Sequence, residues 1–236
     1  MGETEVKYRH EYKYLVSNAQ IMLLKSRIQS IMKPDPHVGG NGIYNIRSVY
    51  FDDYYNRCFY ENEQGLDPRE KFRIRIYNCS SERISLECKR KECGKTLKTS
   101  CRLTKEQADI LLQGKAIDDY GLVPPLLRKM NIEIQTRMLK PVVIVEYERI
   151  PYIYKNGNVR VTFDTNVSSS VDISRFYDID IPKRPIMPVG NQLLEVKFDE
   201  YLPDFIYNSL NLDSLQRTAY SKYYLCRRYS LKKGGV

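Results

Sequence analysis

The chain has 236 residues, enough for one large domain with a sizeable core, and it carries a formal net charge of +9. This basic balance indicates an anionic partner such as a nucleotide, a polyphosphate, a nucleic acid or a lipid head group. No segment approaches the roughly 18–20 uninterrupted apolar residues of a membrane span, and we expect no secretory signal, because the first residues lack an apolar h-region. Six cysteines without a C-x-x-C pair and only two histidines argue against a structural zinc site and favour free thiols in a cytoplasmic protein.

The first half of the chain predicts five strands and one long helix. Ser17 followed by Gln20 is a capping box, and an apolar stripe from Ile21 to Ile31 predicts a helix that ends before Pro34. The links are a loop at 34–42, a short helical or irregular segment at 54–61 and a turn at 65–68. The strands are expected over 7–16, 44–52, 70–78, 83–91 and 95–102.

The second half predicts two more helices, three strands and a helical C-terminal region. Thr104 with Gln107 is a second capping box that opens a helix ending at Gly114, and another helix is expected over 124–136. The strands are expected over 141–150, 158–166 and 192–199, and an Asn-Gly turn joins the first two. Because the links between strands are short, we expect a single antiparallel α+β domain over 1–236, with a core at about 8–228 and a disordered tail at 230–236.

Several predicted strands carry a charge at every second residue. Between Phe72 and Ile76, Arg73 and Arg75 alternate with apolar residues, and Lys71 extends the basic series. Because successive strand side chains point to opposite faces, such a run puts its charges on one face and its apolar groups on the other. A solvated strand face explains one such run. Recurrence on several strands favours a concave basic wall that binds a polyphosphate and that also includes Lys89, Arg160 and Lys197.

Two of these runs place a carboxylate beside an ammonium group, namely Glu87-x-Lys89 and Glu195-x-Lys197. A phosphate site with a divalent metal needs both groups, because carboxylates hold the ion and cations cover the remaining phosphate oxygens. A neutralising pair along a strand is the alternative explanation. Gly94-Lys95-Thr96 lacks the spacing of a P-loop, and two histidines give no basis for a Ser-His-Asp or Cys-His arrangement.

In their order and spacing, these runs resemble one known family. The segments concerned are Tyr12-Lys13-Tyr14, Ser48-Val49-Tyr50-Phe51-Asp52, Lys71 to Tyr77, Leu86-Glu87-Cys88-Lys89, Tyr147-Glu148-Arg149, Val159 to Asp164, Leu194-Glu195-Val196-Lys197 and Tyr220-Ser221-Lys222-Tyr223. Together they resemble the VTC domain, the catalytic domain of the vacuolar transporter chaperone polyphosphate polymerases, in the CYTH-like triphosphate-tunnel superfamily. Each motif alone is weak, but the set covers nearly the whole chain.

The resemblance implies an antiparallel β-barrel that forms a tunnel, with basic side chains inside and helices packed outside. It implies that the phosphate-binding residues are Lys13, Arg73, Arg75, Lys89, Lys98, Arg149, Arg160, Ser221 and Lys222, and that the metal-binding carboxylate is Glu195. We expect the catalytic contacts to the phosphate oxygens to come from Arg73, Arg75, Lys89, Arg149 and Arg160. The strand pattern adds Lys197 to a substrate-binding set that otherwise consists of Lys13, Lys98, Ser221 and Lys222.

The resemblance also implies an activity, the transfer of the γ-phosphoryl group of ATP to a growing inorganic polyphosphate with Mn²⁺ or Mg²⁺ as the metal. Triphosphatases and cyclases of the superfamily open with Glu-x-Glu-x-Lys, whereas this chain has Arg9-His10-Glu11-Tyr12-Lys13. Replacing the first Glu removes a metal-side carboxylate, which favours the polymerase. The expected partners are therefore ATP and polyphosphate rather than nucleic acid, and a membrane partner is left open.

Two alternatives remain open. An inorganic triphosphatase would use the same tunnel with water as the nucleophile, and the carboxylates available to orient that water are Glu11, Glu87, Glu146 and Asp164. A non-catalytic module that binds polyphosphate or RNA is the other alternative. RNA binding favours exposed aromatic residues interleaved with Arg, and nothing in the sequence places the 20 tyrosines on one face.

Overall fold

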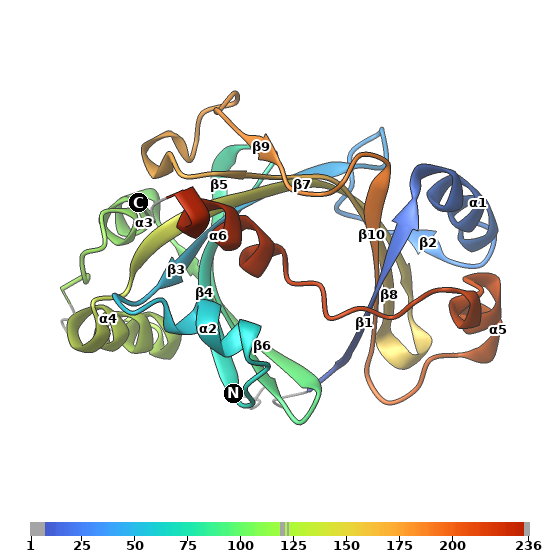
Figure 1. Ribbon diagram of the computed structural model, residues 1–236, viewed down its shortest axis with the longest axis horizontal. Helices are drawn as coiled ribbons and strands as arrows, with labels where there is room; N and C mark the ends of the chain where they lie inside the picture. The colour runs from blue at the N-terminus through green and yellow to red at the C-terminus, as the bar shows by residue number, and fades with distance from the viewer. Residues whose placement is uncertain (1–7, 119–120, 122, 234–236) are drawn as a thin grey trace.

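A computed structural model describes residues 8–118, 121 and 123–233 of the protein. Its main element is one antiparallel sheet with the strand order β1-β10-β8-β7-β3-β4-β5-β6 (Figure 1). In that order the strands span His10–Ser17, Asn191–Phe198, Val159–Ser170, Lys140–Tyr154, Tyr44–Asp52, Arg69–Tyr77, Ser80–Glu92 and Lys95–Leu103. Two short strands, β2 (Lys33–Pro34) and β9 (Arg184–Pro185), pair with β7 and β8.

Helices connect the strands and end the described chain. The α-helices are α1 (Asn18–Ile28), α2 (Arg57–Glu63), α3 (Lys105–Leu112), α4 (Pro125–Arg137), α5 (Asp204–Ser209) and α6 (Lys222–Lys233), and short 3-10 turns span Asn156–Asn158, Ile173–Arg175 and Leu212–Ser214. Ser17 and Thr104 cap α1 and α3 through reciprocal hydrogen bonds with Gln20 and Gln107, as the two capping boxes predict. Within the described ranges, no helix is both long and apolar enough to cross a membrane.

The sheet curls until its two edges meet. Arg9, just before β1, and Thr96 in β6 exchange two backbone hydrogen bonds of 2.9 Å. Figure 1 shows β3 to β6 on one side of the interior and β1, β8 and β10 on the other, with β7 bridging them. The predicted antiparallel α+β barrel fold is confirmed, and its wall is a curled sheet whose edges are joined by one described bridge.

Two apolar cores lie on the convex side of this sheet. Outward residues of β4 and β5, such as Ile74, pack with Leu111 of α3 and Met130 of α4. On the other side, Val196 of β10 packs in a cluster with Ile28 of α1 and with residues of α5. Burying alternate residues outward leaves the intervening side chains of the same strands on the concave side. The charged residues that alternate with this apolar core, such as Arg73 and Arg75, therefore face the interior.

Helix α6 packs on the concave side instead. Tyr223 is buried, its ring centroid lies 5.3 Å from that of Tyr50, and its hydroxyl donates to Asp52. The ammonium group of Lys222 lies 4.6 Å from the ring centroid of Tyr147 on β7. Helix α6 thus covers one end of the interior and brings a basic side chain into it, and Figure 1 shows it crossing in front of the sheet.

The eight predicted strands are all present, with shifts at their ends. β8 continues to Ser170 instead of ending at 166, because Ser168–Ser170 pair with β7 and partly with β9, so sheet pairing overrides the weak strand preference of the serines. β5 begins at Ser80 rather than at 83. The disordered tail predicted for 230–236 is corrected at 230–233, where α6 continues to Lys233, and residues 234–236 lie outside the described part.

Candidate active site

The basic residues of β4 face the concave side of the sheet. Phe72, Ile74 and Ile76 are buried in the outer core, so Arg73 and Arg75 point inward, as the alternation predicts. Arg75 is 6% exposed, and the side chain of Arg73 is 14% exposed. The two guanidinium groups are therefore largely removed from bulk water and need partners inside the protein.

Glu87 on β5 is the shared partner of these cations. Arg73 donates to Glu87 Oε2 from Nε at 2.8 Å and from Nη2 at 2.5 Å, and Arg75 Nη1 lies 3.7 Å from the same oxygen. Lys98 Nζ on β6 lies 3.3 Å from Oε1. Burial opposes ionisation of Glu87, but Arg73, Arg75 and Lys98 hold its pKa well below the usual range. Glu87 is therefore a fixed counter-charge within the basic wall.

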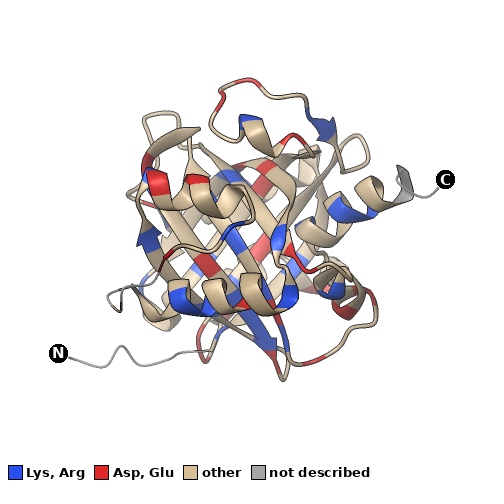
Figure 2. Ribbon diagram, turned by 90° about the vertical axis from the view of Figure 1, so that its left-hand side faces the viewer, with Lys and Arg blue, Asp and Glu red and all other residues tan. Residues whose placement is uncertain are grey.

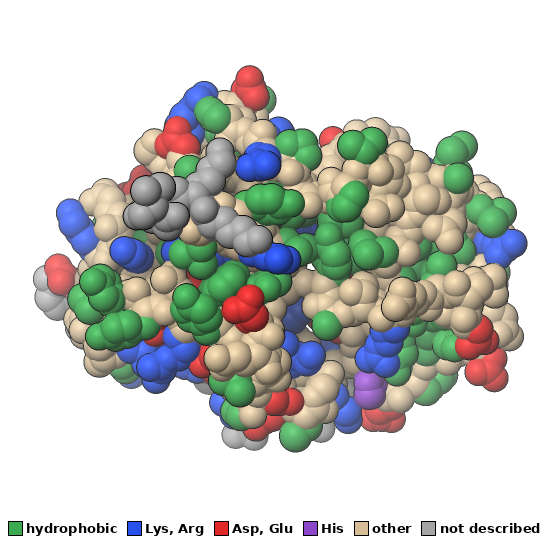
Figure 3. Space-filling view, in the orientation of Figure 1, with side chains coloured by type: hydrophobic (Ala, Val, Ile, Leu, Met, Phe, Trp, Pro, Cys, Tyr) green, Lys and Arg blue, Asp and Glu red, His purple; other side chains and the backbone are tan. Residues whose placement is uncertain are grey.

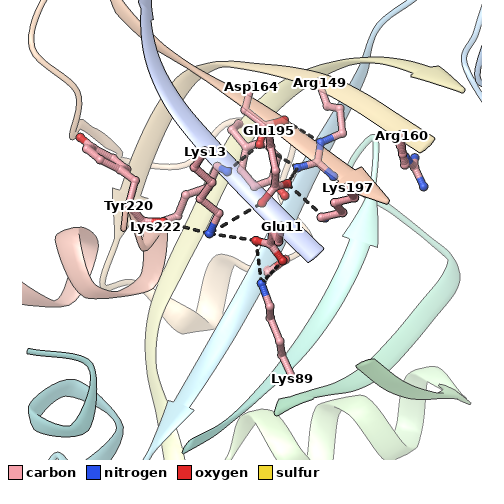
Figure 4. Close-up of polar contacts among 12 residues, drawn as sticks. Glu11, Lys13, Lys89, Arg149, Arg160, Asp164, Glu195, Lys197, Tyr220 and Lys222 are labelled. Carbon is pink, nitrogen blue, oxygen red and sulfur yellow. Dashed lines mark hydrogen bonds and ion pairs between the residues drawn. The ribbon is translucent and has the colours of Figure 1, made fainter. Parts of the chain in front are cut away.

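Arg149 on β7 organises the opposite side of the interior. Its Nε and Nη2 donate to Asp164 of β8 at 2.6 and 2.7 Å, and Nη2 also lies 3.2 Å from Glu195 Oε2. Lys222 Nζ reaches Asp164 at 2.5 Å, and Lys197 Nζ lies 3.1 Å from Glu195. Figure 4 shows these side chains pointing toward one another from β7, β8, β10 and α6.

Glu11 and Lys13 of β1 complete this group. Lys13 Nζ lies 2.9 Å from Glu11 and 3.7 Å from Glu195, and it donates to the Tyr220 carbonyl at 2.9 Å. Lys89 of β5 reaches both Glu11 oxygens, at 2.8 and 2.6 Å. Burial and the Glu195 charge oppose ionisation of Glu11, but Lys13, Lys89 and Lys197 lower its pKa to about 2. Burial lowers the pKa of Lys89 to about 8, against the opposing effect of Glu11.

We call this group the central cluster, and it consists of Glu11, Lys13, Lys89, Arg149, Asp164, Glu195, Lys197 and Lys222. Tyr147 links it to the β4 cations, since its hydroxyl accepts from Arg75 Nη2 at 3.4 Å and its ring lies 5.2 Å from the Arg149 guanidinium carbon. Figure 2 shows charges of both signs interleaved on the strands, and Figure 3 shows a hollow near the middle of one face with Lys and Arg side chains inside it.

Three predicted residues lie at the margin of the central cluster. Arg160 donates to Tyr44 at 2.8 Å and pairs with Asp35 at 2.7 Å, its side chain is 38% exposed, and Figure 4 shows it apart from the other labelled cations. Lys98 is half exposed, with 51% of its side chain accessible. Ser221 Oγ accepts from Lys71 at 3.3 Å. The structure thus gathers the predicted residues on one concave face but holds Arg160 at its edge.

Residues 8–230 match the family model of the VTC domain. The chain belongs to the VTC domain family. The match covers every strand of the sheet and all residues of the central cluster. Among curated proteins, none matches this VTC domain.

Solved structures share the fold of this VTC domain at low sequence identity. A Hippeastrum protein, described as an adenylyl cyclase candidate with a dominant triphosphatase activity, superposes with a TM-score of 0.58 at 11% identity, covering 94% of this chain and 96% of that one. A protein of Pyrococcus horikoshii superposes with a TM-score of 0.51 at 14% identity, covering 96% of this chain and 99% of that one. At these identities the likeness establishes the triphosphate-tunnel fold alone.

The VTC domain offers two neighbouring carboxylates for a divalent metal. Lys13 pairs with Glu195 and Glu11 with Lys197 in the β1–β10 register, so Glu11 and Glu195 lie diagonally across these strands on one face. No group of three or more Asp, Glu, His or Cys residues that could hold an ion occurs in the described ranges. Two carboxylates nevertheless fit Mg²⁺ or Mn²⁺, because such ions keep water and phosphate oxygens as their other ligands.

Some residues of the site have roles that the sequence analysis did not assign to them. Tyr50 accepts a hydrogen bond from Arg73, and Tyr147 accepts one from Arg75. In the sequence, the only indication of these contacts is that the alternation of strand residues turns both tyrosines toward the same face as the arginines. Asp164, considered as a group that orients water, is instead the bidentate partner of Arg149. These tyrosine and carboxylate groups fix the orientation of the arginines before any ligand binds.

One carboxylate proposed for the triphosphatase alternative lies outside the VTC domain interior. Glu146 accepts from the buried Arg47 at 2.5 Å and pairs with Lys183. Arg47 also donates to the carbonyl of Phe176 at 2.9 Å, in the segment that covers the convex side of β3 and β7. The adjacent residue, Tyr147, is the one that faces inward. Glu146 therefore cannot orient water in the central cluster.

Lys71 is a partly buried cation of the interior that pairs with no carboxylate of the described residues, and its substitution tests what burying such a charge costs. It donates to Asn62 and Ser221, forms no ion pair within the described ranges, and has a pKa that burial and then Arg69 lower to about 7. An unfolded lysine titrates near 10.4, so the cost of burying this charge is fully present below pH 7 and vanishes as the pH rises to about 10.4. Lys71→Met is expected to raise the melting temperature, by more at about pH 6 than at about pH 10. A gain that does not change with pH would contradict this interpretation.

Proposed function

We propose that this protein is a polyphosphate polymerase that transfers the γ-phosphoryl group of ATP to the end of an inorganic polyphosphate and releases ADP. The observation that carries the proposal is that Arg149 and four lysines surround the Glu11–Glu195 pair, while Arg73 and Arg75, held by Glu87, face the same interior from β4. Membership of the VTC domain family supports the same reading. ATP and polyphosphate are the partners proposed, in a cytoplasmic setting.

The site suits a reaction that is driven by positioning and charge. A terminal phosphate oxygen of the polymer forms a bond to the γ-phosphorus, the bond from that phosphorus to the β,γ-bridging oxygen breaks, and ADP leaves with the electron pair. The attacking oxygen is already ionised, so no general base is needed. The two histidines have other contacts, since His10 stacks on Phe198 and His37 forms a hydrogen bond with Asp35. Positioning and charge neutralisation supply most of the catalysis in such transfers.

The arginines and lysines of the site are assigned to different phosphate contacts according to their geometry and exposure. Arg73, Arg75 and Arg149 each have several N–H donors on a planar guanidinium group. Their carboxylate, tyrosine and serine partners hold these groups in place for phosphate oxygens. Lys13, Lys89, Lys197 and Lys222 act as point charges around the chain, with Ser221 at the start of α6. Arg160 and Lys98, which are more exposed, contact the outer parts of the phosphate chain.

Glu195, with Glu11 beside it, would hold the Mn²⁺ or Mg²⁺ ion. When bound, the ion would neutralise charge on the phosphate oxygens. The Arg9 position is consistent with a single metal, because its side chain pairs with Asp199 at 3.2 Å instead of supplying a third oxygen ligand. We therefore propose one metal per site, held from β1 and β10.

A triphosphatase is the second candidate, and the Glu11–Glu195 pair is the observation that favours it. Burial opposes ionisation of both carboxylates, but the neighbouring lysines lower their pKa values, and two ionised groups could orient an attacking water. Their oxygens, however, are within ion-pair distance of Lys13, Lys89, Lys197 and Arg149.

Separation of products after incubation with ATP and Mn²⁺ distinguishes these functions. Polymer together with ADP is the expected result. Orthophosphate with ADP and no polymer would replace the proposal by the triphosphatase, and binding of ATP or polyphosphate without any turnover would leave a polyanion-binding module.

A further inference from the structure

A second, smaller group of basic residues lies outside the central cluster. A cavity of about 350 Å³ is lined by Arg83, Ser85, Ser100, Cys101 and Arg102. Arg83 and Ser85 belong to the start of β5, and Ser100 and Arg102 to the end of β6. Lys89, which lies opposite Lys71 in the β4–β5 register, is six residues from Arg83, or about 20 Å along the strand. The cavity is therefore far from the end that α6 covers.

The strand register connects this cavity to the active site without a break. Ser85 pairs with Arg75 on one side and with Arg102 on the other. Two residues further along β5, Glu87 pairs with Arg73 on one side and with Ser100 on the other. Residues paired in this way share one face of a sheet, so the cavity continues the concave face on which Arg73 and Arg75 lie. A ligand that leaves the β4 cations along this face meets Ser85 next, and then Arg83 and Arg102.

The two arginines of the cavity differ from those of the active site in their partners. Arg73 and Arg149 are each held by a buried carboxylate. Arg102 donates to the backbone carbonyl of Glu82 at 2.9 Å and pairs with no carboxylate in the part of the chain that the structure describes. The side chain of Arg83 has neither a hydrogen bond nor an ion pair there, and both arginine side chains are exposed. Two like charges therefore lie at this cavity, and no carboxylate of the described ranges pairs with either of them, so an anionic ligand would stabilise the arrangement.

We infer that this cavity binds the polyphosphate chain beyond the reacting phosphates, so that the polymer runs past Ser85 and Ser100 between Arg83 and Arg102. The inference rests on the proposed function for the identity of the chain. A phosphate chain fits better than a single-stranded nucleic acid, because no aromatic side chain lines the cavity on which a base could stack. The serine hydroxyls supply donors to bridging and terminal phosphate oxygens.

The double variant Arg83→Ala/Arg102→Ala tests this inference by equilibrium binding. Affinity for labelled long-chain polyphosphate is expected to fall by about tenfold or more, equivalent to about 1.4 kcal/mol, whereas affinity for tripolyphosphate falls by less than about twofold. The matched control, Arg27→Ala/Arg137→Ala, removes the same charge from exposed positions on α1 and α4. Arg83→Gln/Arg102→Gln repeats the test if the alanine variant folds poorly.

The outcomes separate this inference from the proposed function. An affinity for long-chain polyphosphate equal to that of the control variant would overturn the inference. An equal loss of affinity for long-chain polyphosphate and for tripolyphosphate would also overturn it, because the two arginines would then act at the central cluster. Competition by single-stranded RNA that is as strong as competition by polyphosphate, and that the double variant abolishes, would mean a nucleic-acid site instead. The binding assay needs no turnover, so its result is independent of the proposed function. The predicted loss of long-chain affinity can be absent although the wild-type protein makes polymer from ATP. It can also be observed in a protein that makes no polymer.

Discussion

Arg73→Ala is expected to lower the rate of phosphoryl transfer by about two orders of magnitude or more, a loss of roughly 3 kcal/mol of transition-state stabilisation. Arg73 is held in a defined orientation by Glu87 and Tyr50, so its charge is already placed for phosphate oxygens and needs no rearrangement during the reaction. The measurement is the steady-state rate of ADP formation at saturating ATP and metal. Arg73→Lys is expected to recover part of the rate, because it keeps the charge but loses the planar fork.

The stability of this variant tells a positional role from a structural one. Glu87 keeps Arg75 and Lys98 as partners, so we expect only a modest decrease in melting temperature. Arg90→Ala is the matched control, because Arg90 lies on the opposite face of β5 and pairs with Glu70 and Glu92. Global unfolding of Arg73→Ala, or an equal loss of rate in Arg90→Ala, would contradict a specific role for Arg73 in transfer.

Glu195→Gln is expected to abolish metal-dependent turnover without weakening the binding of metal-free ATP. The change keeps the size and one carbonyl oxygen but removes the negative charge that a hard divalent ion requires. Arg149, Lys197 and Lys13 then lose an opposing charge, so metal-free ATP binds as tightly as before or more tightly. Separate titrations of Mn²⁺ and of ATP against the variant measure the two effects.

Glu11→Gln serves as the comparison for this experiment. If Glu195 is the principal ligand, Glu11→Gln weakens Mn²⁺ binding less than Glu195→Gln does. Unchanged Mn²⁺ affinity and normal turnover in Glu195→Gln would move the metal to Glu11 or Glu87. That outcome would also favour the triphosphatase, since its ligands would then gather near the N-terminal strand.

The inward direction of the arginines could be predicted from the sequence because strand alternation is a local property. Phe72, Ile74 and Ile76 need an apolar core, which determines where Arg73 and Arg75 point. The capping boxes at Ser17 and Thr104 are local in the same way and mark the helix starts correctly. The family resemblance added Ser221 and Lys222, which no strand pattern could place beside residues of β4 and β8.

The partners of the cations could not be predicted, because they depend on how distant strands pair. Arg160 carries a strand-alternation signal like that of Arg73, yet it turns to Asp35 and Tyr44 at the edge of the site. Glu146 follows the same kind of pattern but faces Arg47 on the convex side. The cavity at Arg83 and Arg102 also depends on the β5–β6 register, which the sequence indicates only as a hairpin.

Turnover of ATP with Mn²⁺ in water enriched in ¹⁸O tests the central claim most directly, because it identifies the group that attacks the γ-phosphorus. If a phosphate oxygen of the polymer attacks, mass spectrometry of the products will find polymer and ADP with no ¹⁸O incorporated during turnover. One ¹⁸O atom in each orthophosphate released, with no polymer formed, would mean that water is the nucleophile and would contradict the polymerase account.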